Sequence, residues 1–333
     1  MSAYTLLGAN EIDKSTNFRY LEFTVTSNKI NIFLIDSLRP ITYNITHMSL
    51  ITHFDPWKNN LCTCPEKYSL SPYTGCGHGC FYCYASSYIR NFSQPRSKKD
   101  FLVRLNKEIK KIPQDSTIAI ANSSDPYLPL EKTMHLTRSA LELFTTYSFR
   151  INIVTKSNLI LKDLPILKNL KKVVVCISLT TLDKNLSKKL EPFAPTPEER
   201  LKTIEKLSSH LPVAVRLDPL IYPLNTTSIQ NIVNKLKQSG AKQIITSTYK
   251  IKPDNFRNMI SAFPEHRTLW QRLYLKTNKN EWPHNYLPED IRKRLIIEVK
   301  QSAENMGLLF SSCREGFNYL NTAACDGSSL FRE

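Results

Sequence analysis

The stretch Ser71-Pro72-Tyr73-Thr74-Gly75-Cys76-Gly77-His78-Gly79-Cys80-Phe81-Tyr82-Cys83-Tyr84-Ala85 contains three cysteines in the spacing C-x3-C-x2-C. Three thiolates this close together can bind three irons of a [4Fe–4S] cluster and leave the fourth iron without a protein ligand. That iron is then open to a substrate or a cofactor. We therefore predict that Cys76, Cys80 and Cys83 hold such a cluster, and that the ring of Tyr82 shields one side of it.

Zinc is the alternative occupant of this loop. A structural zinc site needs four ligands, and His78 is the only further candidate nearby. The x3–x2 spacing with an aromatic residue before the last cysteine fits zinc poorly, so we favour the iron–sulfur cluster. Gly75, Gly77 and Gly79 allow the backbone to bend tightly around it.

The cysteine loop also resembles a known motif. C-x3-C-x2-C with an aromatic residue before the last cysteine is the motif of radical S-adenosylmethionine (SAM) enzymes. The wider text, Pro72–Cys76 and Cys80–Ala85, is similar to the spore photoproduct lyase-like, or DNA repair photolyase, branch. The resemblance runs from about Tyr68 to Lys250, and the tail resembles that of archaeal members. It implies a [4Fe–4S] cluster, reductive cleavage of SAM, and a 5′-deoxyadenosyl radical that takes a hydrogen atom from the substrate.

The composition is that of a folded globular protein. The 333 residues are 41% hydrophobic and 10% aromatic, which excludes wholesale disorder. No stretch approaches the roughly 18 consecutive apolar residues of a membrane span. The segment Met1–Lys14 lacks the apolar core of a signal peptide and carries Glu11 and Asp13. We therefore expect a cytoplasmic protein with no membrane partner.

The charge balance favours a polyanionic partner. Lys and Arg number 45 against 29 Asp and Glu, which gives a formal net charge of +16. Such an excess is typical of nucleic-acid-binding proteins, although a lysine-rich proteome would produce it too. The lysines are scattered and form no single basic tail, so the charge alone favours nucleic acid only slightly.

Short β-branched runs alternate with helical stretches from about residue 68 onward, which predicts parallel strands with helical crossovers. Six such strands predict an α/β fold, a partial (β/α)6 TIM-like barrel as in radical SAM enzymes. The expected strands are Tyr68–Pro72, Thr117–Ala121, Arg150–Thr155, Lys172–Leu179, Val213–Leu217 and Gln243–Thr246. Helices are expected over Lys99–Lys111, Thr137–Tyr147 and Pro288–Met306, with capping-box helix starts at Thr196–Glu199 and Thr227–Gln230.

Segments of a different character flank the barrel. Residues 18–36 alternate in polarity around Ser27-Asn28-Lys29, which predicts a β-hairpin. We therefore divide the chain into an N-terminal extension with that hairpin (1–66), the radical SAM barrel (67–250), and a C-terminal helical extension with a cysteine-containing tail (251–333).

Polar residues follow five of the predicted strands, at the end of a (β/α) barrel where active sites lie. The resemblance implies that several of them bind SAM. Ser124 and Asp125 would accept hydrogen bonds from its amino group, Lys156 would pair with its carboxylate, and Ser178 would contact its ribose or carboxylate. Arg200 would be a second anchor. The alternative for Arg200 is a helix-surface ion pair with Glu191.

One departure from the branch concerns the reaction. Spore photoproduct lyase would require a hydrogen-donating cysteine near the end of the second strand, where this chain has Asn122 and Ser123. We therefore do not predict thymine-dimer reversal. Cys176 lies inside the apolar run Val173–Ile177, and we expect it to be a small buried hydrophobe.

Four further cysteines lie outside the motif, namely Cys62, Cys64, Cys313 and Cys325. Four thiols can fully ligate a second iron–sulfur cluster or a zinc ion if the two ends of the chain meet. The alternative is four unrelated buried or free thiols.

The sequence thus predicts a radical SAM enzyme that modifies or repairs a nucleic acid, with an electron donor such as a ferredoxin or flavodoxin. Modification of a protein or small molecule is a second possibility. A non-catalytic iron–sulfur or zinc nucleic-acid-binding protein is a third.

Overall fold

The computed structural model describes residues 49–54, 61–120, 123–276 and 285–331, together with the backbone of three strands nearer the N-terminus. Met1–Lys14, Ala121 and Asn122, which entered the predictions above, lie outside the described residues. The chain divides into two compact units, Met1–Ser49 and Leu50–Glu333. The predicted boundaries at residues 66 and 250 remain predictions.

The first unit contains a three-stranded antiparallel sheet. Strands β1 (Leu21–Thr26) and β2 (Lys29–Leu34) pair as the predicted hairpin, and β3 (Ser37–Asn44) pairs with β2. The hairpin is therefore confirmed, with Lys29 in β2 rather than in the turn, and β3 is an addition that the sequence pattern did not indicate.

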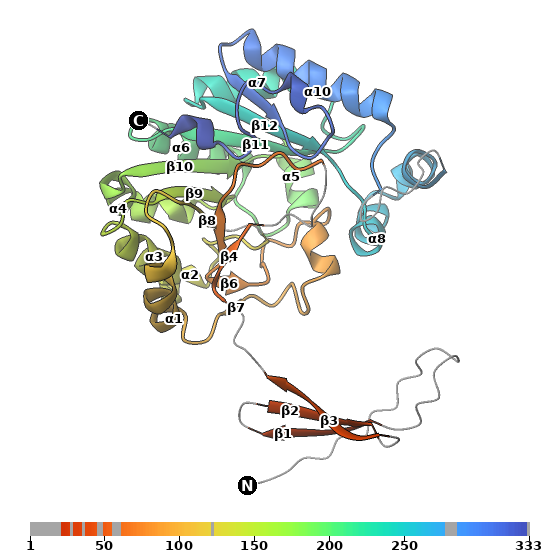
Figure 1. The fold of residues 1–333 in the computed structure, drawn as a ribbon. Helices are drawn as coiled ribbons and strands as arrows, with labels where there is room; N and C mark the ends of the chain where they lie inside the picture. Colours follow the sequence, from red (N-terminus) through yellow and green to blue (C-terminus); the bar gives the residue numbers. More distant parts are fainter. Residues whose placement is uncertain are drawn as a thin grey trace. The chain divides into compact units, whose positions relative to one another are not determined.

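The second unit is built on one eight-stranded sheet (Figure 1). All neighbouring strands are parallel except the β4–β5 pair. The sheet stays open, with β4 and β13 at its two edges, as a partial barrel requires. Its order is β13 (Leu309–Ser312), β12 (Gln243–Thr248), β11 (Val213–Leu220), β10 (Lys172–Ser178), β9 (Arg150–Thr155), β8 (Thr117–Ile120), β5 (Tyr68–Leu70) and β4 (Ile51–His53). A short separate pair joins β6 (Tyr73–Thr74) to β7 (Arg96–Ser97).

The six predicted strands are thus confirmed, and β13 adds a seventh parallel strand. The sequence pattern missed β13 because it has only four residues, two of them serines. It also missed β4, which pairs with β5 from the N-terminal side. Segments on both sides of the predicted barrel therefore contribute strands to its sheet.

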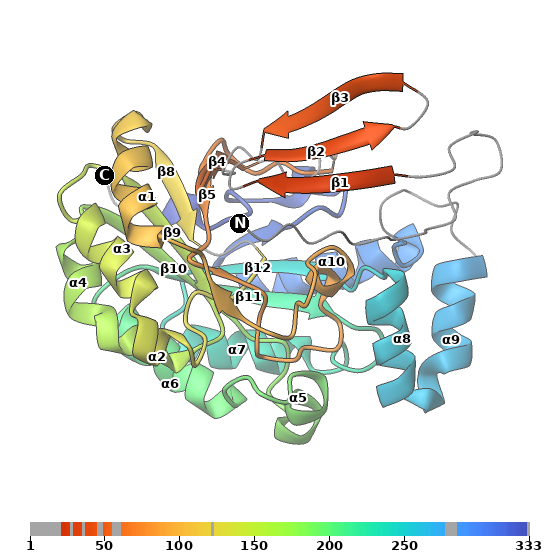
Figure 2. The same cartoon turned by 90° about the horizontal axis from the view of Figure 1, so that it is seen from below.

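Helices cover one face of this sheet (Figure 2). The α-helices are α1 (Phe101–Glu108), α2 (Glu131–Met134), α3 (Leu136–Phe144), α4 (Leu164–Asn169), α5 (Lys184–Leu190), α6 (Pro197–Ser208), α7 (Ile229–Gln238), α8 (Pro253–Ala262), α9 (Arg267–Gln271) and α10 (Glu289–Glu304). Short helical turns are η1 (Tyr84–Ser87), η2 (Ile109–Lys111), η3 (Asn158–Asp163), η4 (Pro264–His266), η5 (Arg272–Lys276), η6 (Asn318–Leu320) and η7 (Ser328–Leu330). No helix in the described part of the chain is long and apolar enough to cross a membrane.

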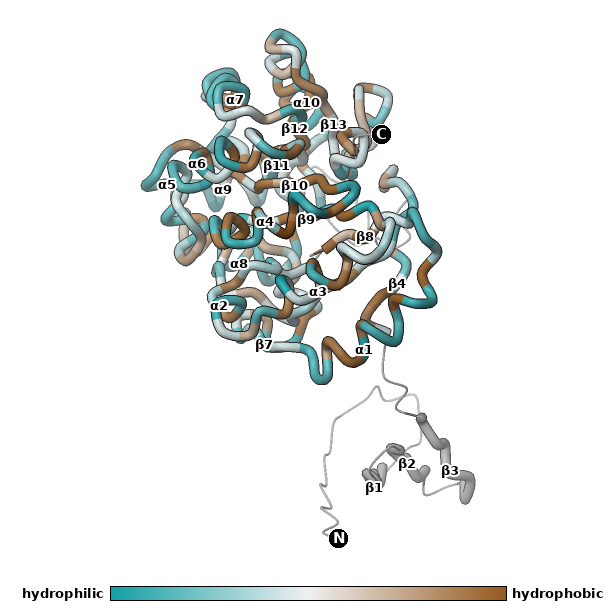
Figure 3. The backbone as a smooth tube through the Cα atoms, turned by 90° about the vertical axis from the view of Figure 1, so that its left-hand side faces the viewer, coloured by the Kyte–Doolittle hydropathy of each residue, from teal (hydrophilic) through white to brown (hydrophobic). Residues whose placement is uncertain are grey.

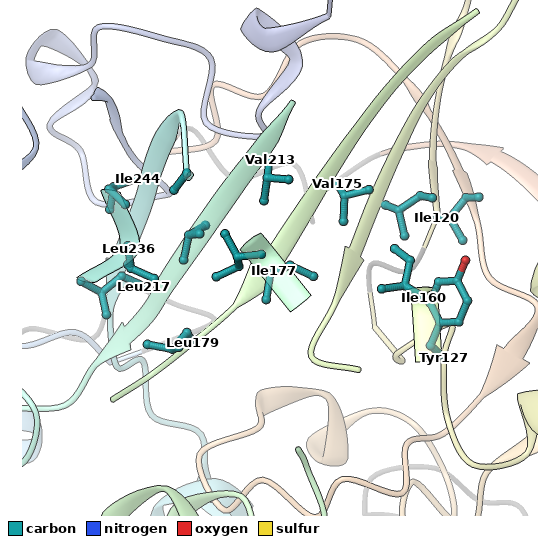
Figure 4. Close-up of a cluster of buried hydrophobic side chains, with 14 of the residues drawn as sticks. Ile120, Tyr127, Ile160, Val175, Ile177, Leu179, Val213, Leu217, Leu236 and Ile244 are labelled. Carbon is teal, nitrogen blue, oxygen red and sulfur yellow. The ribbon is translucent and has the colours of Figure 1, made fainter. Parts of the chain in front are cut away.

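The sheet–helix interface forms the main core. Val175, Ile177 and Val213 point toward the helices and are fully buried together with Leu236 of α7 (Figure 4). Hydrophobic residues run along β9 and β10 in Figure 3, as expected for strands buried on both faces. Burying one such side chain stabilises the fold by about 1.5–3 kcal/mol.

The two predicted capping boxes have different outcomes. At α6, the Thr196 hydroxyl accepts from the backbone N–H of Glu199, and the Glu199 carboxylate accepts from the backbone N–H of Thr196. This prediction is confirmed. At α7 the capping box is wrong, because the helix begins at Ile229 with Ser228 as its cap and no side-chain capping bond. A capping box needs the glutamine at the third helical position, from which its side chain reaches back to the capping residue. Gln230 is the second helical residue.

The C-terminal tail lies against the sheet face opposite the helices. Cys176, Val174 and Ala214 form a second buried cluster there, against which Leu330 and Phe331 pack. Cys176 is fully buried, as predicted.

Glu315 fastens this tail to the rest of the unit. Its carboxylate accepts from the Thr248 backbone N–H at 2.8 Å and from Lys250 Nζ at 2.5 Å, and it pairs with Arg292 of α10 at 3.3 Å. The Glu315 side chain is fully buried. Removing one member of a buried ion pair leaves the others uncompensated, which is costly.

We predict that Glu315→Ala lowers the free energy of unfolding by about 3–5 kcal/mol. The matched control is Glu304→Ala, which removes the Lys300 ion pair on the surface of α10 and costs about 0.5 kcal/mol or less. Urea denaturation of both variants measures the difference. Equal losses would show that the buried network does not hold the tail.

Candidate functional site

The cysteine loop follows β5 at the carboxyl end of the parallel sheet, where the sequence placed the active site. Three backbone hydrogen bonds hold it in place. Cys76 N donates to Phe92 O at 2.7 Å, Phe81 N donates to Leu190 O at 3.0 Å, and Phe193 N donates to His78 O at 3.1 Å. The loop is therefore fixed at both ends and in the middle by residues from other segments.

The three motif thiols lie close enough for the charge of one to affect another. The pKa of Cys76 is raised to about 11, mainly by burial. The negative charge of Asp125 raises it further, and that of Cys83 adds a smaller increase. Burial also raises the pKa of Cys80, where Cys83 and Cys76 add to the effect and Lys156 opposes it. The protein alone thus disfavours the thiolates, so a metal group that binds here has to displace the thiol protons.

This donor set fits an iron–sulfur cluster better than a single ion. A structural zinc ion needs four ligands, whereas the motif supplies three thiols. The three motif thiols interact through space, as expected for ligands spread around a multi-iron cluster. The assignment of Cys76, Cys80 and Cys83 as cluster ligands stays a prediction that this arrangement supports.

Asp125 connects the cysteine loop to the sheet. Its carboxylate lies 3.0 Å from His78 Nε2 of the loop and accepts from Thr155 Oγ1 at 2.6 Å. It also accepts from the backbone N–H of Lys156 at 2.7 Å and of Tyr127 at 2.9 Å. Burial opposes the charge, but His78 and these donors outweigh it and lower the pKa of Asp125 to about 2. Both oxygens are therefore engaged within the protein.

Ser124, predicted beside Asp125 as a SAM contact, lies in the same layer. Its hydroxyl donates to Tyr73 O at 3.0 Å and is nearly buried. The structure therefore brings Ser124 and Asp125 together under the cysteine loop, with positions set by the protein's own hydrogen bonds.

Lys156 places a positive charge beside the motif cysteines. Its Nζ lies 5.8 Å from the centroid of the Tyr82 ring. Burial lowers its pKa, but the charges of Cys80 and Glu191 outweigh that effect and raise it. A protonated amine in this position is suited to pairing with a carboxylate.

Ser178 lies at the end of β10, in the chain position that the sequence predicted, and 7% of it is exposed. Two residues further on, the Thr180 hydroxyl donates to the Glu191 carboxylate at 2.8 Å. Ser178 therefore belongs to the same strand end as the Glu191 group.

Arg200 lies in the core. It is 1% exposed and pairs with the equally buried Glu191. Its Nε donates to Pro195 O at 2.8 Å and its Nη1 to Ser178 O at 3.2 Å. The Glu191 pairing foreseen as the alternative is thus present, although it is buried and not on the helix surface. These partners occupy the guanidinium that would otherwise anchor SAM.

Tyr82 is also held in place by Glu191. Its hydroxyl donates to Glu191 and lies 3.2 Å from Thr180 Oγ1. Its backbone carbonyl accepts from Asn255 Nδ2 at 3.0 Å. The predicted shielding of the cluster by this ring remains a prediction, and the contacts show that the ring cannot swing away freely.

Sequence reasoning missed two residues here. Asn255 of α8 holds the Tyr82 carbonyl, and no local pattern links α8 to the cysteine loop. Tyr88 is the second: it is 44% exposed and stacks on Tyr84 at 6.3 Å between ring centroids. Its hydroxyl donates to Ser123 Oγ at 3.1 Å, so its ring lies across the surface and not inward.

Comparison with known proteins agrees with this fold. The Radical SAM superfamily profile matches residues 70–236, and the chain belongs to that superfamily. A protein of Methanocaldococcus jannaschii is 31% identical over 143 residues, which cover 42% of this chain and 55% of that protein. A protein of Acidianus two-tailed virus is 28% identical over 239 residues, 65% of this chain and 76% of that protein. The chain therefore spans little more than half of the archaeal relative.

Solved structures show a similar fold. A spore photoproduct lyase variant with bound AdoMet and dinucleoside spore photoproduct has a TM-score of 0.60 at 17% identity, over 73% of this chain and 75% of that chain. Spore photoproduct lyase complexed with dinucleoside spore photoproduct has a TM-score of 0.57 at 17% identity, over 73% and 76%. At this identity the likeness establishes the shared fold.

The loop geometry generates a prediction about cluster assembly. Gly75 has a φ of +82°, and an added Cβ would lie 2.6 Å from Phe92 O. We predict that Gly75→Ala disfavours the loop conformation roughly tenfold or more, from the cost of a left-handed residue alone. The measurement is iron and acid-labile sulfide per chain after anaerobic reconstitution.

The matched control for this variant is Gly77→Ala. The nearest heavy atom to its added Cβ is Pro95 Cγ at 3.6 Å, an ordinary contact. This variant should keep its iron. Full iron loading in Gly75→Ala would mean that the loop conformation does not govern cluster binding.

Proposed function

We propose that this protein is a radical SAM enzyme that binds a [4Fe–4S] cluster through Cys76, Cys80 and Cys83. The observation that carries the proposal is the position of Lys156 beside the cysteine motif. Its backbone N–H donates to Asp125, which also contacts His78 of the motif, and its Nζ lies 5.8 Å from the Tyr82 ring centroid. When bound, the cluster supplies the electron that cleaves SAM to a 5′-deoxyadenosyl radical. A ferredoxin or flavodoxin in the cytoplasm is the proposed electron donor.

The chain's own residues have distinct roles in this proposal. Lys156 pairs with the SAM carboxylate, since its Nζ lies next to the Tyr82 ring of the motif and its charge acts on the Cys80 thiol. Ser178 contacts the ribose or carboxylate from the end of β10, and Ser124 accepts from the amino group. Asp125 acts as a positioning residue, because its oxygens already hold His78, Thr155 and the backbone of Lys156.

Tyr82 and Arg200 complete the arrangement. Arg200 neutralises Glu191, and Glu191 in turn accepts from the Tyr82 hydroxyl. In this proposal Arg200 contributes to SAM binding through Glu191 and Ser178 and not by direct contact. The pair keeps the Tyr82 ring beside the cluster and excludes water from it.

We predict that Lys156→Met weakens SAM binding roughly 10- to 150-fold, the effect of losing a hydrogen bond to a charged group worth about 1.5–3 kcal/mol. Equilibrium binding of SAM to the anaerobically reconstituted protein measures this, with iron content checked in each sample. The control is Lys162→Met, which removes an exposed lysine of η3. Unchanged SAM affinity in Lys156→Met would remove this lysine from the site.

The activity itself is tested by 5′-deoxyadenosine formation in the presence of SAM and a reductant. Product that disappears when Cys76, Cys80 and Cys83 are changed to Ala supports the radical mechanism. Absence of product from protein with an intact cluster, with and without nucleic acid, would favour the non-catalytic binding protein.

A nucleic acid is the substrate class we propose. Tyr88 presents an exposed ring stacked on Tyr84, and Lys252 Nζ lies 5.4 Å from the Tyr88 ring centroid. An aromatic ring next to a cation suits a base and its phosphate. The net charge of +16 acts in the same direction. The structurally similar spore photoproduct lyase binds a dinucleoside photoproduct, which supports the same class.

The reaction on that nucleic acid is proposed to differ from thymine-dimer reversal, because Ser123 stands near the end of β8 where a donor cysteine would be required. If 5′-deoxyadenosine formation responds to no nucleic acid, a protein or small molecule becomes the favoured substrate.

We predict that Tyr88→Ala weakens binding of a single-stranded oligonucleotide roughly 5- to 150-fold, since base stacking on an aromatic side chain is worth about 1–3 kcal/mol. Fluorescence anisotropy at several salt concentrations measures the affinity, which should fall as salt rises. Tyr319→Ala is the control, because Tyr319 is 65% exposed in the tail. Equal losses in both variants would contradict a specific role for Tyr88.

A further inference from the structure

The four cysteines outside the motif meet in one place. Cys64 Sγ lies 3.5 Å from Cys325 Sγ, although the two residues are 261 positions apart in sequence. The Cys62–Cys64 segment contacts Cys325 at a second point, since Thr63 Oγ1 lies 4.0 Å from Cys325 Sγ. Cys313 packs against the buried cluster that contains Cys176, and Cys176 Sγ donates to the carbonyl of Asp326, the residue after Cys325. The four cysteines therefore lie in one place, on the face of the sheet opposite the helices.

Two cations lie beside this group. Lys67 is buried and pairs with Asp326, the residue after Cys325, at 2.5 Å. Arg216 of β11 is partly buried and pairs with Asp218 at 2.7 Å. Because side chains alternate along a strand, Arg216 lies on the same face of the sheet as Ala214, which belongs to the buried cluster against which Cys313 packs. Each carboxylate holds its cation in place beside the thiols.

The backbone around the group is held firmly. The Asp326 carbonyl accepts from Asn152 Nδ2 of β9 at 2.5 Å and from Cys176 Sγ of β10 at 3.4 Å. Cys313 N donates to Thr246 O at 2.8 Å, which continues the pairing of β13 with β12. Cys325 is 2% exposed. The backbone beside Cys313 and Cys325 is thus fixed on the face of the sheet opposite the helices.

We propose that Cys62, Cys64, Cys313 and Cys325 form a structural tetrathiolate zinc site that joins the segment before the barrel to the C-terminal tail. Zn–S bonds of about 2.3 Å in a tetrahedron put neighbouring sulfurs roughly 3.8 Å apart, close to the 3.5 Å contact. Cysteines around a second [4Fe–4S] cluster would be separated by the cluster itself. The complex would carry two negative charges, which Lys67 and Arg216 face.

The thiols have to rotate to complete this tetrahedron, because the described residues contain no group already arranged to hold a single ion. Cysteine side chains have one rotatable bond that moves the sulfur, and the backbone anchors stay in place during such a rotation. The site is separate from the motif cysteines, so it does not depend on the proposed SAM chemistry.

The test is zinc and iron per chain in the full-length protein, measured by mass spectrometry of the metals. Wild type and the triple variant Cys76→Ala, Cys80→Ala, Cys83→Ala should both hold one zinc per chain, whereas only wild type holds cluster iron. Cys64→Ser with Cys325→Ser should lose the zinc at least tenfold and keep the iron. Cys176→Ala is the control, because it removes a buried thiol next to Asp326 that is not among the four ligands.

Zinc content that is unchanged in Cys64→Ser with Cys325→Ser overturns the proposal. So does iron that is lost with these two cysteines, which would indicate a second cluster, and so does a Cys64–Cys325 disulfide without metal. If the double variant does not fold, cobalt(II) is added to wild type after zinc removal by a chelator. Thiolate-to-cobalt charge-transfer bands with tetrahedral ligand-field bands support the site, and their absence overturns it.

Discussion

The carboxylate of Asp125 is the contact on which the rest of the candidate site depends. It lies between His78 of the cysteine loop and the ends of β8 and β9, and it also binds the backbone of Lys156. A buried carboxylate is stable only when donors surround it, so each of these groups is fixed by the need to satisfy the charge. The cysteine loop and the lysine beside it therefore have positions that are set together.

Two other buried carboxylates follow the same principle. Glu191 pairs with Arg200 and accepts hydrogen bonds from Thr180 and Tyr82, and it thereby orients the Tyr82 ring next to the third cysteine. Glu315 pairs with Lys250 and Arg292 and accepts from the Thr248 backbone N–H, and it thereby fixes the tail. Each carboxylate joins segments that are distant in sequence, so the functional edge of the sheet is organised by charge satisfaction as much as by apolar packing. The apolar packing is concentrated on the helical face, where Val175 and Ile177 lie.

Sequence patterns predicted the parallel strands well because β9 and β10 are buried on both faces and read as apolar runs. The motif cysteines were found for a similar reason, since their spacing is local. What depended on distant contacts was harder to predict. β13 is too short to show a period, and the burial of Arg200 depends on Glu191, Ser178 and Pro195 arriving from different segments. Tyr88 has the spacing of a core residue, and only the fold shows that its ring faces outward.

The path of the tail across the sheet has a consequence for biosynthesis. Cys325 contacts Cys64 across 261 residues of sequence, and Phe331 packs near Val174 and Cys176. At about 5–20 residues per second, a ribosome needs roughly 10 to 50 seconds to make the intervening chain. The 111 residues between the end of β11 and Phe331 take roughly 6 to 22 seconds of this time. Over that interval the face of β10 and β11 that carries Val174, Cys176 and Ala214 lacks the tail that packs on it. The nascent barrel therefore exposes apolar surface that a chaperone could protect until the tail arrives.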